Sequence, residues 1–151
     1  MKKIRIASGA GYAGDRIEPA IDVMKNGDID YIAFECLAER TIAIAQSEKL
    51  KNPDKGYNNL LEERFNEIDE YILRFETFLN YSKCKDIGIP SYLNRNILKL
   101  IVENCGTAGY IISSKAIVNL TKFINSLNSE ELCAIDLIMF NKFNRCTYQL
   151  S

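Results

Sequence analysis

The stretch KKIRIASGAGYAGDRIEP, residues 2–19, decides the fold class that the sequence predicts. Lys2–Ser8 alternates like a short β-strand and includes β-branched residues. The glycine-rich run Gly9–Asp15 then predicts a turn. Pro19 suits the first turn of a helix that we expect to extend to about Lys25, because proline lacks only an N–H that has no helical partner there. A strand, a turn and a helix in this order predict the start of a parallel α/β sheet.

The same alternation of strand and helix continues to about residue 50. Ile29–Leu37 reads as a second, mostly buried strand, and Ala38–Leu50 reads as a second helix. Lys51–Asn59 contains Pro53 and Gly56 and is predicted to be a loop. The chain therefore opens with a β-α-β-α order, which favours buried parallel strands.

The pattern of strand and helix signals in the sequence changes after Phe65. Asn66–Asn80 reads as helix, or as helix followed by a strand at Tyr71–Phe78. The remaining expected elements are strands at 97–102, 106–113 and 146–150, helices at 114–127 and 135–143, and a break at 86–92. We predict an α/β fold made of an incomplete βαβα unit of a parallel sheet followed by a second α/β fragment, with a boundary between residues 65 and 66.

The composition excludes several classes of function. A net charge of −1 without a cluster of lysine or arginine argues against nucleic acid as a partner. No run reaches the roughly 18 apolar residues that a membrane-spanning helix needs, so we expect a cytoplasmic protein without a transmembrane segment. The absence of histidine excludes Ser-His-Asp and Cys-His catalysis. The five cysteines lack metal-binding spacing and are expected to be buried free thiols.

The glycines of the first turn allow more than one interpretation. Gly9, Gly11 and Gly14 formally satisfy G-x-G-x-x-G, and Glu35 lies 21 residues beyond the last of them. Pro19, however, places the first helical turn about five residues after Gly14, which is too late for the helix N-terminus to face a pyrophosphate. A turn that lines an active cleft and a purely structural turn both remain open, and both are favoured over a dinucleotide site.

Four stretches in the first half of the chain resemble the acyclic terpene utilisation (AtuA-like) family. They are Arg5–Ala20, Asp30–Ala43, Gly56-Tyr57 and Leu60–Arg64. The resemblance implies an α/β opening in proteins tied to the breakdown of branched terpenoid or related acids. Ligands of parallel sheets lie at the carboxyl ends of the strands. The ligand-binding candidates of this half are therefore Gly9, Gly11, Gly14, Asp15, Arg16, Glu35, Glu39 and Arg40.

Four stretches in the second half resemble glycosyltransferase family 25, which acts in lipooligosaccharide biosynthesis. They are Tyr71–Phe78, Gly106–Ala116, Ile135–Phe140 and Tyr148–Ser151. The resemblance implies sugar transfer from a nucleotide donor, with a divalent metal, Mn or Mg, on the diphosphate and a base for the acceptor hydroxyl. Its matching carboxylates are the catalytic candidates Glu76 and Asp136.

Two of these assignments keep a structural alternative. Gly106 and Gly109 leave room for an acceptor sugar, and Tyr110 either stacks on that sugar or belongs to the core. Asp136 begins a predicted helix, where an acidic residue is also favoured by the helix dipole.

Neither resemblance extends over the whole of its family's pattern. The match to the first family ends near residue 65. The half of the second family's pattern that contains its acidic, metal-holding residues has no counterpart in this sequence. We therefore expect a composite or truncated protein without complete catalytic activity of its own. The alternative is a transferase that takes a nucleotide sugar or another small molecule, with Mn or Mg as its cofactor. Two half-sheets also predict exposed strand edges, through which copies of the chain associate.

Overall fold

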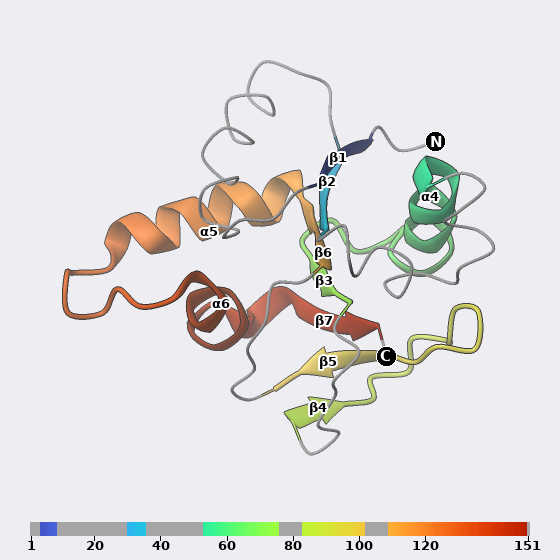
Figure 1. The fold of residues 1–151 in the computed structure, drawn as a ribbon. Helices are drawn as coiled ribbons and strands as arrows, with labels where there is room; N and C mark the ends of the chain where they lie inside the picture. The colour runs from blue at the N-terminus through green and yellow to red at the C-terminus, as the bar shows by residue number, and fades with distance from the viewer. Residues whose placement is uncertain (1–3, 9–29, 36–52, 76–82, 102–108, 151) are drawn as a thin grey trace.

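Seven strands of the described residues form one mixed sheet (Figure 1). The computed structural model describes residues 4–8, 30–35, 53–75, 83–101 and 109–150. The strands are β1 (Ile4–Ser8), β2 (Tyr31–Glu35), β3 (Ile72–Arg74), β4 (Cys84–Lys85), β5 (Ile97–Leu100), β6 (Gly109–Ser113) and β7 (Thr147–Leu150). Their order across the sheet is β1-β2-β6-β3-β7-β5-β4. The α/β fold class predicted from the sequence is confirmed.

The sheet is continuous across the boundary predicted near residue 65. β1 and β2 pair in parallel, as the opening stretch predicts. β2 also pairs in antiparallel fashion with β6, from Tyr31 opposite Ser113 to Glu35 opposite Gly109. β6 then pairs with β3, which pairs in parallel with β7. The described sheet therefore has β1 and β4 as its edges, and association of copies through those edges stays a prediction.

Helices cover the two faces of this sheet (Figure 1). One face carries α5 (Ser114–Ser126), the short α6 (Ile135–Leu137) and the π-helical segment η2 (Ile138–Lys142). Their apolar residues pack with Ile72 and Ile112 from the sheet in one buried cluster. A 3-10 turn, η3 (Asn144–Cys146), then leads into β7.

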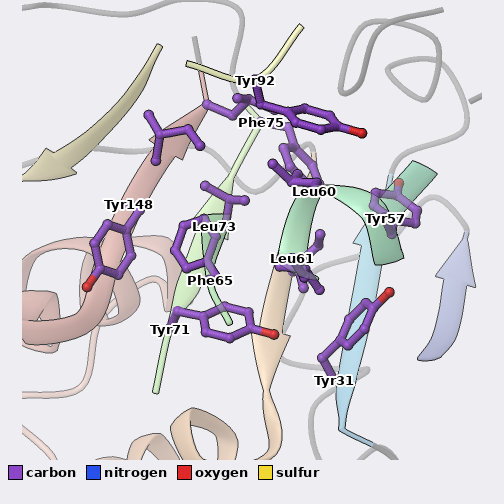
Figure 2. Close-up of a cluster of buried hydrophobic side chains, with 13 residues drawn as sticks. Tyr31, Tyr57, Leu60, Leu61, Phe65, Tyr71, Leu73, Phe75, Tyr92 and Tyr148 are labelled. Carbon is purple, nitrogen blue, oxygen red and sulfur yellow. The ribbon is translucent and has the colours of Figure 1, made fainter. Parts of the chain in front are cut away.

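The opposite face is covered by α4 (Pro53–Arg64). Figure 2 shows Tyr57, Leu60 and Leu61 of this helix, followed by Phe65, packed against aromatic and aliphatic side chains from the strands. The ring centroid of Phe65 lies 5.0 Å from that of Tyr71 and 5.2 Å from that of Tyr148. Residues on both sides of the predicted boundary thus share one core.

The loop predicted for Lys51–Asn59 is wrong from Pro53 onward, because α4 begins there. A proline in the first helical turn loses no hydrogen bond, so Pro53 starts the helix instead of preventing it. Gly56 inside the helix costs about 1 kcal/mol relative to alanine. Full burial of Tyr57, Leu60 and Leu61 outweighs that cost, since burying each such side chain contributes about 1.5–3 kcal/mol.

Most other expected elements are found with shifted ends. The helix expected at 114–127 is α5, and the one expected at 135–143 is divided between α6 and η2. The strands expected at 97–102 and 146–150 are β5 and β7. β4 was not predicted. The predicted helices at 19–25 and 38–50 lie outside the described residues.

The described cysteines are free thiols, but they are not uniformly buried. Cys146 is buried, and burial is the main cause that raises the pKa of its thiol to about 11. Cys84 is half-buried, and Cys133 is exposed, which corrects the expectation for that residue. Within the described ranges, none of the helices combines the length and the apolar composition that crossing a bilayer requires.

Candidate functional site

The predicted ligand-binding segments of both halves begin or end at one edge of the sheet. β1, β2, β3 and β7 run in the same direction, whereas β5 and β6 run in the opposite one. The carboxyl ends of β1, β2, β3 and β7 therefore lie along one edge, which we call the carboxyl edge. β6 starts at this edge with Gly109, opposite Glu35. In open α/β sheets, ligands bind outside the carboxyl ends of the parallel strands, which makes this edge the candidate site.

Chain connectivity brings candidates from the two resemblances to the carboxyl edge. Gly9 directly follows Ser8, the last residue of β1, and Glu35 is itself the last residue of β2. Glu76 directly follows Phe75, whose N–H donates a hydrogen bond to the carbonyl oxygen of Gly109 at 2.9 Å. The site thus draws on segments that are far apart in the sequence.

Nine of the predicted site residues lie outside the described residues. They are Gly9, Gly11, Gly14, Asp15, Arg16, Glu39, Arg40, Glu76 and Gly106. Their assignments stay predictions. The structure describes Gly109, Tyr110 and Asp136, together with the backbone of Glu35.

Tyr110 lies in the core immediately inside the carboxyl edge. Its side chain has no exposed area, and its ring meets that of Phe140 edge-on, with centroids 6.5 Å apart at 82°. Gly109 beside it is also buried. Of the two alternatives for Tyr110, the core position agrees with this placement, and its role as a ligand contact stays a prediction.

Arg74 is a charged residue of the carboxyl edge that the sequence reasoning missed. It is 2% exposed, and its Nε donates a hydrogen bond to Oε1 of Gln149 at 2.7 Å. Its guanidinium carbon lies 5.1 Å from the ring centroid of Phe140. Because a positive charge held in a low-dielectric setting acts over a long range, Arg74 favours anions at the nearby edge. The available signal was one arginine inside the otherwise apolar run YILRF of residues 71–75.

Asp136 occupies the first turn of α6, where its half-buried carboxylate accepts a hydrogen bond from the N–H of Leu137 at 2.9 Å. This contact is of the kind that an acidic residue makes at a helix start. The structural alternative for Asp136 therefore has a described contact. Its catalytic assignment stays a prediction.

The described residues do not fit a divalent metal. Among them, no three acidic or cysteine side chains come together as ligands. Mg and Mn prefer several oxygen ligands, usually including carboxylates. We therefore derive no step of a reaction through a metal bound to the described part of the chain.

Comparison with known proteins confirms both resemblances. The model of the acyclic terpene utilisation family protein AtuA matches residues 4–77, just under half of the chain. The lipooligosaccharide biosynthesis protein lic2B of Haemophilus influenzae is 56% identical over 103 residues. The chain is similar to two different families.

The similarity to lipooligosaccharide proteins covers a fraction of each relative. The lic2B match covers 67% of this chain and 39% of lic2B. The lex-1 protein of Haemophilus influenzae is 38% identical over 99 residues, which cover 62% of this chain and 33% of lex-1. The lacto-N-neotetraose biosynthesis glycosyltransferase LgtE of Neisseria gonorrhoeae is 39% identical over 83 residues. These residues cover 55% of this chain and 30% of LgtE. The chain thus spans about two fifths or less of these relatives.

The two resemblances overlap in the sequence. A match to 67% of the chain and a family model over residues 4–77 together exceed its length, so they share residues within 4–77. The similarity to lic2B is also longer than the roughly 80 residues between the first and last motifs quoted above. The boundary between residues 65 and 66 stays a prediction.

Proposed function

We propose that this chain takes part in sugar transfer from a nucleotide donor during lipooligosaccharide biosynthesis. The observation that carries the proposal is the 56% identity to lic2B over 103 residues. The similarity to lex-1 and to LgtE supports the same assignment. Because the chain spans 39% of lic2B, the activity is proposed for the part of a transferase that this chain represents.

The fold supports a role for the carboxyl edge in this reaction. The motifs of the second half supply β3, β6 and β7, which are neighbours in the interior of the sheet. β3 and β7 end at the carboxyl edge and β6 begins there. In the sequence, Glu76 follows Phe75 directly and Gly106 stands three residues before Gly109. Buried Arg74 adds a positive charge beside the carboxyl edge, which suits the anionic diphosphate of a nucleotide sugar.

The proposed reaction needs one group to accept a proton. The acceptor hydroxyl oxygen forms a bond to the anomeric carbon of the donor sugar, and the bond from that carbon to the nucleoside diphosphate breaks. The hydroxyl proton passes to a general base. Glu76 is our first candidate for this base, and Asp136 is the second. Binding of Mn or Mg to the donor diphosphate is part of the proposal.

A competing proposal is that the chain has no complete activity of its own and is a composite of two families. The AtuA match over residues 4–77 favours this alternative. In that case, β1 and β2 extend a sheet whose interior strands come from transferase-like sequence. They then contribute nothing to sugar transfer. The two proposals differ in whether the chain binds a nucleotide sugar.

The test is titration calorimetry of the full chain with UDP-sugars in the presence of Mn, followed by transfer onto a lipooligosaccharide acceptor. We expect binding, and a loss of transfer of about 100-fold or more in Glu76→Gln, because a general base typically contributes that much. Glu67→Gln removes an exposed carboxylate beyond α4 and serves as the matched control. If the chain neither binds a UDP-sugar nor transfers one, the transferase proposal is wrong and the composite remains.

A further inference from the structure

A basic pocket of about 390 Å³ lies at the opposite edge of the sheet from the candidate site. α5 contributes Asn119, Lys122 and Phe123 to its lining, and the chain around the end of η2 contributes Lys142, Phe143 and Arg145. Arg145 belongs to η3, which precedes the amino end of β7. The pocket is therefore separate from the carboxyl edge.

The charges around this pocket are predominantly positive. Lys122, Lys142 and Arg145 all line it, and among the described residues Glu70 is the carboxylate bonded to its lining. Oε1 of Glu70 accepts hydrogen bonds from Arg145 at 2.6 Å and from Asn119 at 2.9 Å. Three cations against one carboxylate leave a net positive charge, which favours an anionic ligand.

Glu70 holds two of the residues that line the pocket, Arg145 and Asn119. Burial raises the pKa of this carboxyl, but the hydrogen bonds from Asn119 and Arg145 outweigh burial, and the pKa is lowered overall. Glu70 is therefore ionised at neutral pH and competes with an incoming anion for the same donors. An anion that binds here takes over part of that interaction.

Aromatic rings form an apolar part of the same pocket. The centroids of Phe123 and Phe143 are 5.5 Å apart, and the guanidinium carbon of Arg145 lies 5.2 Å from the Phe143 centroid. Phe143 is 5% exposed, whereas Phe123 is half-buried. Phe123 thus adds a partly exposed apolar ring to the lining, beside the cations of the pocket.

We propose that this pocket binds a soluble phosphate ester attached to a sugar or similar ring. A phosphate offers several acceptor oxygens to donors that arrive from different elements, which suits lysines and an arginine better than a single carboxylate does. The volume is within the range of small-molecule sites. The proposal does not depend on sugar transfer at the carboxyl edge.

The test is titration calorimetry of the full chain, at low ionic strength, with inorganic phosphate, glucose 1-phosphate and glucose. We expect glucose 1-phosphate to bind more tightly than inorganic phosphate, and glucose not to bind. Lys122→Ala and Lys142→Ala should each weaken the binding of glucose 1-phosphate by about two- to fivefold, as expected for exposed charge pairs. Glu70→Gln should strengthen it, because the competing carboxylate is gone.

Lys55→Ala is the matched control, since it removes an exposed lysine from α4 on the other face of the sheet. Thermal melting of each variant establishes that it is folded. The proposal is overturned if the wild-type chain binds neither inorganic phosphate nor glucose 1-phosphate. It is also overturned if Lys55→Ala weakens the binding of glucose 1-phosphate as much as Lys122→Ala and Lys142→Ala do.

Discussion

At the scale of single residues, Arg74 and Gln149 form a buried polar contact beside the candidate site. Both side chains are almost fully buried, and the 2.7 Å hydrogen bond between them joins neighbouring parallel strands. A charge that is removed from water is tolerated only when its donors are satisfied. Removal of either partner therefore leaves a costly group behind.

Gln149→Leu should lower the free energy of unfolding by about 3 kcal/mol, because the buried guanidinium loses an acceptor. Arg74→Met should also destabilise, and the double variant should lose clearly less than the sum of the two. Urea denaturation of the four proteins measures this double-mutant cycle. Strict additivity would contradict the proposed coupling.

The pKa of Glu70 determines how this residue should change the stability of the folded chain at acid pH. Its pKa is lowered in the folded chain relative to the ordinary value of 4.5, so the folded state is favoured by ionised Glu70 above that value. The stabilisation is then lost as the pH falls through the lowered pKa. Urea midpoints measured from neutral pH to about pH 3 should fall less steeply in Glu70→Gln than in the wild type. Parallel curves would show that Glu70 contributes nothing to the acid transition.

At the scale of elements, the start of α5 is fixed by one buried hydroxyl. Oγ of Ser113 accepts hydrogen bonds from the N–H of Ala116 at 3.3 Å and from the N–H of Tyr71 at 3.1 Å. The first contact caps the helix, and the second ties the helix start to the chain that enters β3. One side chain therefore joins a helix, the end of β6 and the residue before β3.

Ser113→Ala should destabilise the chain by about 2 kcal/mol, since loss of a helix cap costs about 1 kcal/mol and a second backbone donor loses its acceptor. Ser114→Ala is the control. The hydroxyl of Ser114 donates to the carbonyl oxygen of Asp30 at 2.9 Å in a more exposed position, so we expect a smaller loss. Thermal denaturation of the two variants compares them, and equal losses would contradict the special role of Ser113.

The elements also show what the sequence could predict. Local patterns predicted β1, β2 and α5, because such patterns depend on residues that are close together in the chain. The same local reasoning failed at α4, where tertiary burial of Tyr57 and Leu60 outweighs the signals of Pro53 and Gly56. The antiparallel pairing of β2 with β6 has no local signal at all.

The sequence likewise predicted some features of the candidate site and missed others. The opening stretch predicted that β1 and β2 run parallel and so end at one edge, and their pairing confirms this. The assignment of Gly9 and Glu35 as ligand-binding residues stays a prediction. That Gly109 starts at the same edge follows from pairing that the sequence did not indicate. The pocket around Lys122 was missed because its cations come from separate elements that only packing brings together.

At the scale of the whole molecule, one sheet and one shared core connect the two resemblances. Phe65 is fully buried between Tyr71 and Tyr148, and Leu61 before it belongs to the same cluster (Figure 2). A core that spans the predicted boundary favours a single cooperative unit. The two segments should not unfold independently.

Phe65→Ala should therefore lower the free energy of unfolding by about 3–5 kcal/mol and leave a single transition. Far-ultraviolet circular dichroism and tyrosine fluorescence, followed in the same urea titration, should give coincident curves for the wild type and the variant. Two separate transitions in the wild-type chain would instead support two independent fragments.

The position of β6 between β2 and β3 has a consequence for biosynthesis. During translation, β1 and β2 emerge before β6, the strand that pairs with the other side of β2 and is complete only after Ser113 has been made. β7, which lies between β3 and β5, is synthesised after all the other described strands. Strand pairing over such long separations is slow, and unpaired strands attract other chains meanwhile. The nascent chain should therefore need protection by a chaperone until β7 has left the ribosome.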